Sequence, residues 1–275
     1  MGTEILSKTN RLFWLGRYVE RTMIEIEVMM VAYDDAIDRN DFDFRTFCER
    51  LEIEPEIRFT QQRDSFGNEL AIGCAREPHD RIGYHSRGRV RIDLTTNRAM
   101  LIHPLFKYPS PLATPDDDMR EWAHEQGFVR EAFGVEPEAR LAQLERLGQA
   151  VHDLMEYAPG ATSVTTTAAE AFAAKRGVCQ DFAHIMAAVL RDAGVPARYV
   201  SGLAVGEGTT HAWVQAYVGD RWRGYDPTRN NLVDETYLPI AIGRDWSDCP
   251  VERGSFWGLV DQTQTVFMTM KEIEA

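Results

Sequence analysis

The sequence lacks the features that would place it in several special classes of protein. No apolar run approaches the roughly 20 residues that cross a membrane, and the first residues lack the apolar core of a signal peptide. The four cysteines are scattered and form no CxxC motif, which argues against a disulfide framework or a zinc site. Basic residues are in the minority, with 30 Lys and Arg against 43 Asp and Glu and a net charge of −13. We therefore expect a cytoplasmic protein with no metal or cofactor and with no nucleic-acid or membrane partner.

The remaining composition is that of an ordinary folded protein. The 275 residues are 44% apolar and 27% charged, close to globular averages. At about 100–200 residues per domain, this length predicts one large domain or two modest ones. Such a chain can bury a core without covalent staples.

An amphipathic pattern runs through the first forty residues. Apolar side chains recur at steps of three or four, at Leu12, Leu15, Val19, Met23, Ile26, Met30, Tyr33 and Ile37. This spacing predicts one long helix over residues 1–40, whose apolar face packs on its own domain or on a partner.

Residues 41–104 alternate between apolar and polar with a period of two. The alternation predicts a meander of about four short antiparallel strands with one buried face. Its apolar runs are Leu51 to Phe59, Leu70 to Cys74, Ile82 to Tyr84 and Val90 to Leu94. Pro55 within the first run indicates an edge strand or a bulge.

Residues 105–262 predict a separate core that combines helices and strands. After a proline-rich connector, helical patterns open at 115–118 and cover 138–156, 167–176 and 179–193, and strand patterns cover 197–205, 211–218, 221–226, 237–242 and, beyond this core, 265–270. The helix over 179–193 is apolar nearly all round, and an antiparallel sheet follows it. This combination predicts an α+β fold.

Cys179 is the first candidate for chemistry. It lies at the predicted N-terminus of the buried helix, where free backbone N–H groups and the positive helix end stabilise an anion such as a thiolate. Gly177, two residues earlier, allows a sharp entry into that helix. The alternative interpretation is a buried core cysteine at a helix start. Asp181 falls in the first helical turn, where capping is its simplest role.

His211 and Asp226 are the second and third candidates. Gly219-Asp220 is a two-residue turn signal between two strand-like runs. If Val218 then faces Arg221, His211 and Asp226 become diagonal neighbours on one sheet face, with Cβ atoms about 7 Å apart. The carboxylate would reach the imidazole, and the three residues would supply a nucleophile, a base and a residue that orients the base. The alternative is a solvated hairpin that carries a His and an Asp by chance.

Four motifs in this order resemble the transglutaminase-like superfamily, and its prokaryotic cytoplasmic branch most closely. They are Gly177-Val-Cys-Gln-Asp-Phe-Ala-His184, Gly194-Val-Pro-Ala-Arg-Tyr-Val-Ser-Gly202, His211-Ala-Trp213 and Tyr225-Asp-Pro-Thr228. The resemblance implies a papain-like core with Cys179 as nucleophile, His211 as general base and acid, and Asp226 as the orienting residue. It also implies acyl transfer through a thioester, without calcium. A C-terminal strand over residues 263–271 is expected to join the N-terminal β region.

Five further residues are weaker candidates for supporting the site or lining the substrate. They are Gln180, Asp181, Trp213, Tyr157 and Tyr225. The Cys179 backbone N–H can supply one donor of an oxyanion hole. For the second donor, Trp122 and Tyr157 are the candidates.

The first helix resembles a different family. Residues Leu6 to Arg21 look like the opening of the bacterial alpha-E family, over about 35 residues in all. No catalytic role carries over from it. The resemblance and the apolar face leave open a homodimer or a helical partner that docks through residues 5–38.

We therefore predict a cysteine-dependent acyl transferase that acts on a peptide or protein substrate. Hydrolysis of a peptide, isopeptide or amide bond is favoured over transamidation, since the sequence shows no site for an acceptor amine. The alternative hypothesis is a non-catalytic scaffold on the same fold, or an assembly module that acts through the N-terminal helix.

Overall fold

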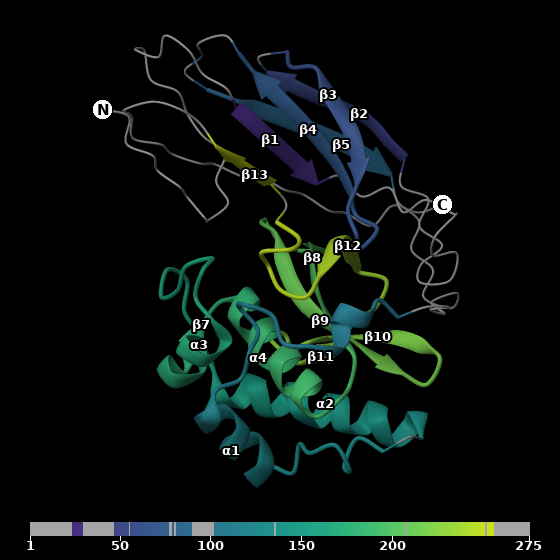
Figure 1. Cartoon of the computed structure of the whole chain (residues 1–275), viewed down its shortest axis with the longest axis vertical. Helices are drawn as coiled ribbons and strands as arrows, with labels where there is room; N and C mark the ends of the chain where they lie inside the picture. Colours follow the sequence, from purple (N-terminus) through teal and green to yellow (C-terminus); the bar gives the residue numbers. More distant parts are fainter. Residues whose placement is uncertain are drawn as a thin grey trace.

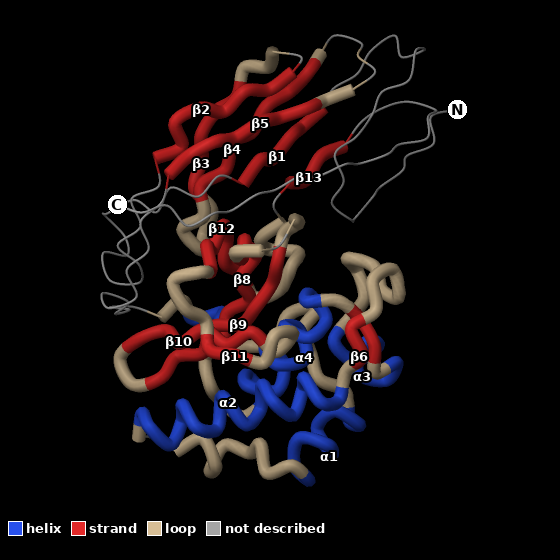
Figure 2. Tube along the Cα trace, turned by 180° about the vertical axis from the view of Figure 1, so that it is seen from behind, coloured by secondary structure: helices blue, strands red, loops and turns tan. Residues whose placement is uncertain are grey.

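The computed structural model describes residues 24–29, 47–54, 56–76, 79, 81–89, 102–134, 136–206, 208–250 and 252–255. Figure 1 shows two parts, an upper part of strands and a lower part in which helices cover a five-stranded sheet. Figure 2 shows the same division from behind. The predicted α+β fold is confirmed.

The five-stranded sheet of the lower part positions the site. Its strands are β8 (Ala197–Ala204), β9 (His211–Val218), β10 (Arg221–Asp226), β11 (Asn231–Leu232) and β12 (Tyr237–Gly243). They lie in the order β11-β10-β9-β8-β12, and each neighbouring pair is antiparallel. The hairpin from β9 to β10 turns at Gly219-Asp220 with Val218 opposite Arg221, which confirms the predicted register. Gly219 has φ of 67°, a conformation that glycine adopts without steric cost.

Four helices lie in the lower part. They are α1 (Asp117–Glu125), α2 (Pro137–Leu154), α3 (Ala168–Ala174) and α4 (Cys179–Asp192), preceded by the short 3₁₀ helix η2 (Pro104–Lys107). Of these, α2 and α4 contact the five-stranded sheet, and α1 and α3 pack on α4. Every residue of α4 from Gln180 to Arg191 is buried, so α4 is the central helix that its apolar sequence predicts. Gly194, with φ of 78°, follows its end. Within the described ranges, no helix has both the length and the apolar character needed to cross a membrane.

Apolar side chains fill the space on both faces of the sheet. The larger cluster joins the apolar side of α4 to Ala212, Val214 and Ala216 of β9. The smaller cluster, on the opposite face, contains Trp213 of β9 with Trp222 of β10. Successive residues of a strand point to opposite faces, so the strand that begins with His211 is held in register from both sides.

The upper part is a pair of antiparallel sheets rather than the predicted meander. Its strands are β1 (Ile24–Met29), β2 (Phe47–Glu54), β3 (Phe59–Arg63), β4 (Glu69–Ala75), β5 (Gly83–Arg89) and β13 (Glu252–Ser255). One sheet has the order β13-β1-β4-β3 and the other pairs β2 with β5. The predicted first run, Leu51 to Phe59, is therefore divided between two sheets. Long-range pairing overrides the order of neighbours that a meander assumes, and the predicted fourth run lies outside the described residues.

The predicted helix over residues 1–40 is wrong at residues 24–29, which form β1. Ile24, Ile26 and Val28 alternate with Glu25 and Glu27 in this segment, and β-branched residues at every second position favour a strand. β1 pairs with β4 on one side and with β13 on the other. Ile26 fits both the helical and the strand spacing, and the pairing with β4 and β13 selects the strand. The other residues of the predicted helix, and the expected strand over 263–271, lie outside the described residues.

A two-residue parallel pair and a hairpin tip make the remaining connections. β6 (Glu156–Tyr157) pairs with β7 (Arg176–Gly177) immediately before α4. The tip between β3 and β4 reaches the lower part, where Asn68 is buried and its side chain accepts from Ile242 N at 2.8 Å and donates to Ile242 O at 2.7 Å. β12 is the edge strand of its sheet, so Asn68 satisfies backbone groups that this edge would leave unpaired.

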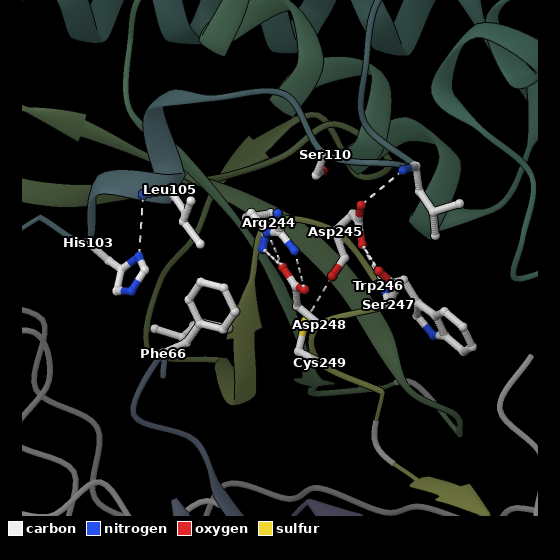
Figure 3. Close-up of polar contacts among 12 residues, drawn as sticks. Phe66, His103, Leu105, Ser110, Arg244, Asp245, Trp246, Ser247, Asp248 and Cys249 are labelled. Carbon is white, nitrogen blue, oxygen red and sulfur yellow. Dashed lines mark hydrogen bonds and ion pairs between the residues drawn. The ribbon is translucent and has the colours of Figure 1, made fainter. Parts of the chain in front are cut away.

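Aromatic contacts and a compact turn flank this junction. Phe66 packs against His103 and Phe106 with ring centroids 5.0 and 5.4 Å away. In the turn after β12, Arg244 donates to Asp248 at 2.7 Å, and Asp245 accepts from the backbone N–H of Ser247 (Figure 3). The upper part is thus attached to the lower through a small, well-packed contact next to the end of β12.

Candidate active site

Cys179 is the first residue of α4 and is half-buried. Its backbone N–H lies in the first turn, where the donors have no partner within the helix. The preceding Val178 is extended (φ −116°, ψ −179°). A Cβ on Gly177 would lie 2.4 Å from Asp181 Oδ2, so glycine is required there because the carboxylate packs against the backbone. The helix therefore presents a thiol at its positive end.

His211 and Asp226 meet as the hairpin register predicts. His211 opens β9, Asp226 closes β10, and His211 Nε2 lies 2.6 Å from Asp226 Oδ2. Both side chains are buried, with 5% and 0% of their surfaces exposed. This is the length of a charge-assisted hydrogen bond.

Cys179 completes the arrangement from the other side of the imidazole. The Cys179 side chain lies near enough to His211 to influence the imidazole, as the Asp226 carboxylate does. Because Nε2 is taken by Asp226, Nδ1 is the ring nitrogen that remains for the sulfur. Burial favours the neutral ring, but the hydrogen bonds and charges of Asp226 and Cys179 outweigh it and raise the pKa of His211 to about 9. The structure thus brings Cys179, His211 and Asp226 together, with a hydrogen bond between His211 and Asp226.

Asp226 is surrounded by donors. Its Oδ1 accepts from the backbone N–H groups of Thr228 at 2.9 Å and Arg229 at 3.2 Å. Its Oδ2 accepts from Tyr237 Oη at 2.9 Å in addition to His211. Burial raises the pKa of Asp226, but the hydrogen bond and charge of His211, with the Tyr237 and Arg229 hydrogen bonds, hold it below its usual value. Asp226 is therefore an ionised acceptor in the folded protein.

The donors around Asp226, which are Tyr237 and the backbone N–H groups of Thr228 and Arg229, were missing from the sequence-based candidates. Tyr237, the first residue of β12, donates to Asp226 and also lies 3.2 Å from Asn231 Oδ1. β12 pairs with β8 and not with β10, so no hairpin counting leads from Asp226 to Tyr237. The backbone N–H groups after Asp226 carried a signal, because an Asp before Pro-Thr favours a turn in which its carboxylate accepts from the chain two residues on.

Gln180 and Asp181 hold the loop beside the thiol. Gln180 Nε2 donates to Val164 O at 3.1 Å. Asp181 Oδ2 accepts from Val178 N at 2.7 Å and from Thr162 Oγ1 at 2.6 Å. Burial raises the pKa of Asp181 against the effect of these hydrogen bonds. Both side chains therefore act on loop 162–164 and on the start of the helix, the capping role expected for Asp181.

The other weak candidates divide into packing residues and one exposed residue. Trp213 is fully buried with its ring 5.3 Å from that of Tyr237. Tyr225 points to α2, against Gly148, and its hydroxyl donates to Asn230 Oδ1 at 2.6 Å, so it does not face the thiol. Tyr157 is 55% exposed beside Phe182.

Trp122 packs among aromatic side chains. Its ring lies 5.9 Å from that of Phe128 and 5.5 Å from that of Phe172. It therefore belongs to the packing between α1 and α3. No three His, Cys, Asp or Glu side chains of the described residues gather as a metal ion would require.

Comparisons with known proteins bear on this geometry. The model of the transglutaminase-like superfamily matches residues 129–227, a span that contains Cys179, His211 and Asp226. The uncharacterized protein ML0607 of Mycobacterium leprae is 42% identical over 114 residues, which are 38% of this chain and 40% of that protein. The uncharacterized protein Rv2569c of Mycobacterium tuberculosis is 29% identical over 253 residues, covering 78% of each. The present chain thus matches well under half the length of the first relative.

A solved structure shares the overall fold. The crystal structure of a proposed cysteine protease from Cytophaga hutchinsonii superposes with a TM-score of 0.63 at 20% identity, covering 91% of this chain and 94% of that one. Residues 129–227 therefore match the model of the transglutaminase-like superfamily, and the predicted papain-like fold is confirmed. The alpha-E resemblance of the N-terminal segment stays a prediction.

Proposed function

We propose that this chain, whose residues 129–227 match the model of the transglutaminase-like superfamily, catalyses acyl transfer from a peptide, isopeptide or amide bond to water, with Cys179 as nucleophile. The observation that carries the proposal is the hydrogen bond of His211 to Asp226 beside Cys179, whose side chain helps to raise the pKa of His211. A thiol at a helix N-terminus beside an imidazole with a raised pKa pairs a nucleophile with the group that carries its proton.

Acylation follows from this pair. The Cys179 sulfur attacks the substrate carbonyl carbon, and the Cys179 backbone N–H donates to the oxygen that becomes negative. The C–N bond then breaks as His211 Nδ1 gives its proton to the leaving nitrogen, which departs as an amine. A thioester on Cys179 and a neutral His211 remain.

Deacylation reverses the proton transfer. His211 takes a proton from water, the hydroxide attacks the thioester carbonyl, and the C–S bond breaks to release a carboxylic acid. Asp226 keeps Nε2 of His211 as a donor in both steps, so Nδ1 is the nitrogen that exchanges the proton. An amine in place of water would give transamidation by the same steps.

Thiol alkylation tests the proposal without a known substrate. With iodoacetamide near pH 7 and mapping of the labelled peptides, Cys179 is expected to react first. His211→Ala should slow it at least about ten-fold, because an unperturbed thiol is only a few per cent thiolate at that pH. Cys74, half-buried on β4, and Cys249, fully buried with its thiol pKa raised by burial, are controls within the same molecule. Labelling of Cys179 at the rate of Cys74, or unchanged in His211→Ala, would favour the non-catalytic scaffold.

An activated ester shows which acceptor, water or an amine, takes the acyl group. With p-nitrophenyl acetate and methylamine together, acetate is the expected product, and N-methylacetamide would show transamidation instead.

Because the pKa of His211 is about 9, the rate at which Cys179 is acylated by an amide substrate should fall as the pH rises through that value, when His211 loses the proton that the leaving amine needs. A constant rate through pH 10 would contradict the role of His211 as general acid.

A further inference from the structure

We propose that Tyr237 is a positioning residue of this site, whose hydroxyl holds Asp226 in the ionised state and orientation that His211 requires. The inference rests on the proposed function but assigns a role to a residue outside the three that carry the chemistry. Its basis is the set of contacts around one buried carboxylate.

Each oxygen of Asp226 receives two hydrogen bonds. Oδ1 accepts from two backbone N–H groups of the turn that follows, and Oδ2 is shared by His211 Nε2 at 2.6 Å and Tyr237 Oη at 2.9 Å. The backbone donors hold one end of the carboxylate, and Tyr237 holds the end that His211 uses. Without the hydroxyl, Oδ2 would keep only His211 and the ion pair with Arg229 at 4.0 Å, and the position of the carboxylate that orients the His211 ring would be less well defined.

The ring of Tyr237 is rigidly placed. It is 1% exposed, its centroid lies 5.3 Å from that of Trp213 in an edge-to-face arrangement, and it lies 6.2 Å from the His211 ring. The guanidinium of Arg229 lies 5.5 Å from its centroid. A hydroxyl on a ring fixed by these contacts can orient Asp226 at little further cost in side-chain entropy.

The ionisable groups around Asp226 come from several elements. His211 approaches from β9, Tyr237 from β12 and Arg229 from the following turn, where its Nε lies 4.0 Å from Oδ2. Cys179 reaches His211 from α4, and Tyr225 lies on the neighbouring position of β10. Arg229 is partly exposed, so water screens its charge. Tyr237 is the buried neutral donor in this group, and burial with the nearby Asp226 charge raises its pKa to about 12.

Tyr237 therefore remains a donor at every pH at which the site would work. Its hydrogen bond lowers the proton affinity of Asp226. Removing the hydroxyl should let Asp226 take up a proton at a higher pH, and a protonated Asp226 no longer supports the imidazolium. The acid side of the pH profile should therefore respond more strongly than the alkaline side.

The experiment measures the alkylation rate of Cys179 against pH in the full chain. In Tyr237→Phe, the rate on the acid side should fall about ten-fold, since a hydrogen bond to a charged group is worth about 1.5–3 kcal/mol and 1.4 kcal/mol is a factor of ten. The acid limb should move to higher pH. Tyr225→Phe is the matched control, because it removes a hydroxyl that binds Asn230 in the same turn without touching Asp226, and its acid limb should stay in place.

A second variant keeps the test decisive if Tyr237→Phe folds poorly. A fluorinated tyrosine at position 237 has nearly the same shape but a more acidic hydroxyl, so it donates more strongly. It should move the acid limb to lower pH, opposite to the shift in Tyr237→Phe. A purely structural role would not produce shifts of opposite sign.

The outcomes separate this inference from the proposed function. If Cys179 reacts in a His211-dependent way while both Tyr237 variants keep the wild-type acid limb, the positioning role is overturned and the proposed function stands. If Cys179 shows no His211-dependent reactivity in the wild type, the proposed function fails first. An equal shift in Tyr225→Phe would also overturn the role, because it would show that any loss in the turn moves the profile.

Discussion

The five-stranded sheet and the four-stranded sheet differ in how their strands are buried and in how far apart in the chain their partners lie. β8, in the five-stranded sheet, is buried at seven of its eight positions, whereas β3, in the upper part, is exposed at four of five. β8, β9 and β10 pair with the next strand along the chain, whereas β1 pairs with β4 and with β13. Burial on both faces fixes the register of a strand more strongly than burial on one. The five-stranded sheet can therefore hold two side chains, such as His211 and Asp226, within hydrogen-bond distance of each other.

The largest expected effect compares a glycine of the five-stranded sheet with a glycine of β5 in the upper part. Gly202 lies opposite His211, and a Cβ there would be 2.3 Å from Leu238 O and 2.4 Å from Trp213 Cη2. Gly202→Ala should lower the free energy of unfolding by about 3 kcal/mol, the upper part of the usual range for overpacking. Gly83→Ala in β5, where a Cβ would meet nothing within 4 Å, should change it by less than about 0.5 kcal/mol. Equal effects in urea unfolding would remove the contrast between the sheets.

The second expected effect is a loss of unfolding free energy at acid pH that comes from His184 in the helical part. His184 of α4 is fully buried, and burial, with the charge of Arg191, lowers its pKa to about 4 against the opposing charge of Asp245. The unfolded chain binds the proton more tightly, so this contribution is complete above about pH 6.5 and is lost as the pH falls toward 4.

At about 1.36 kcal/mol for each unit, the loss is at most about 3 kcal/mol. His184 Nε2 accepts a hydrogen bond from Trp246 N at 3.1 Å, and His184→Gln keeps an acceptor near that donor. It should flatten the fall in unfolding free energy between pH 6.5 and 4. An unchanged slope would move the acid sensitivity to other groups.

The smallest expected effect concerns the junction between the two parts. Asn68→Ala would leave Ile242 N and O without their partner, and an unsatisfied buried group costs about 1–3 kcal/mol. We expect a loss of about 2 kcal/mol of unfolding free energy, together with faster hydrogen exchange at the Ile242 amide. Gln62→Ala, exposed on β3 of the same hairpin, is the control and should leave that exchange unchanged. If both variants behave alike, the tip does not hold the edge of β12.

The hairpin shows how much of the site could be predicted from the sequence. Gly219-Asp220 set the register of β9 and β10, and alternation then placed Asp226 beside His211. The apolar sequence of α4 placed Cys179 at a helix start. These contacts are local in the chain or follow from a single helix, so the pattern of nearby residues carries them.

Tyr237 and β1 show where such reasoning fails. Tyr237 reaches Asp226 because β12 crosses over to pair with β8, a choice that depends on the packing of the whole sheet. The spacing of Leu12 to Ile37 favoured a helix, but Ile26 in β1 pairs with Gly73 and Gly254, which are distant in the chain. Local propensity is a weak prior when partners this far away compete with it.

The pairing of β1 with β13 also sets an order of events during synthesis. The strand that lies next to residues 25–28 is made of residues 252–255, so the edge of β1 stays open until the whole five-stranded sheet has been translated. A fragment cut after β12 would contain every residue of the proposed site but would leave the upper sheet with an unpaired strand, the kind of edge that promotes association between chains. Truncation is therefore expected to give fragments that aggregate. A circular permutant that brings residues 252–255 ahead of β1 offers a better way to separate the two parts.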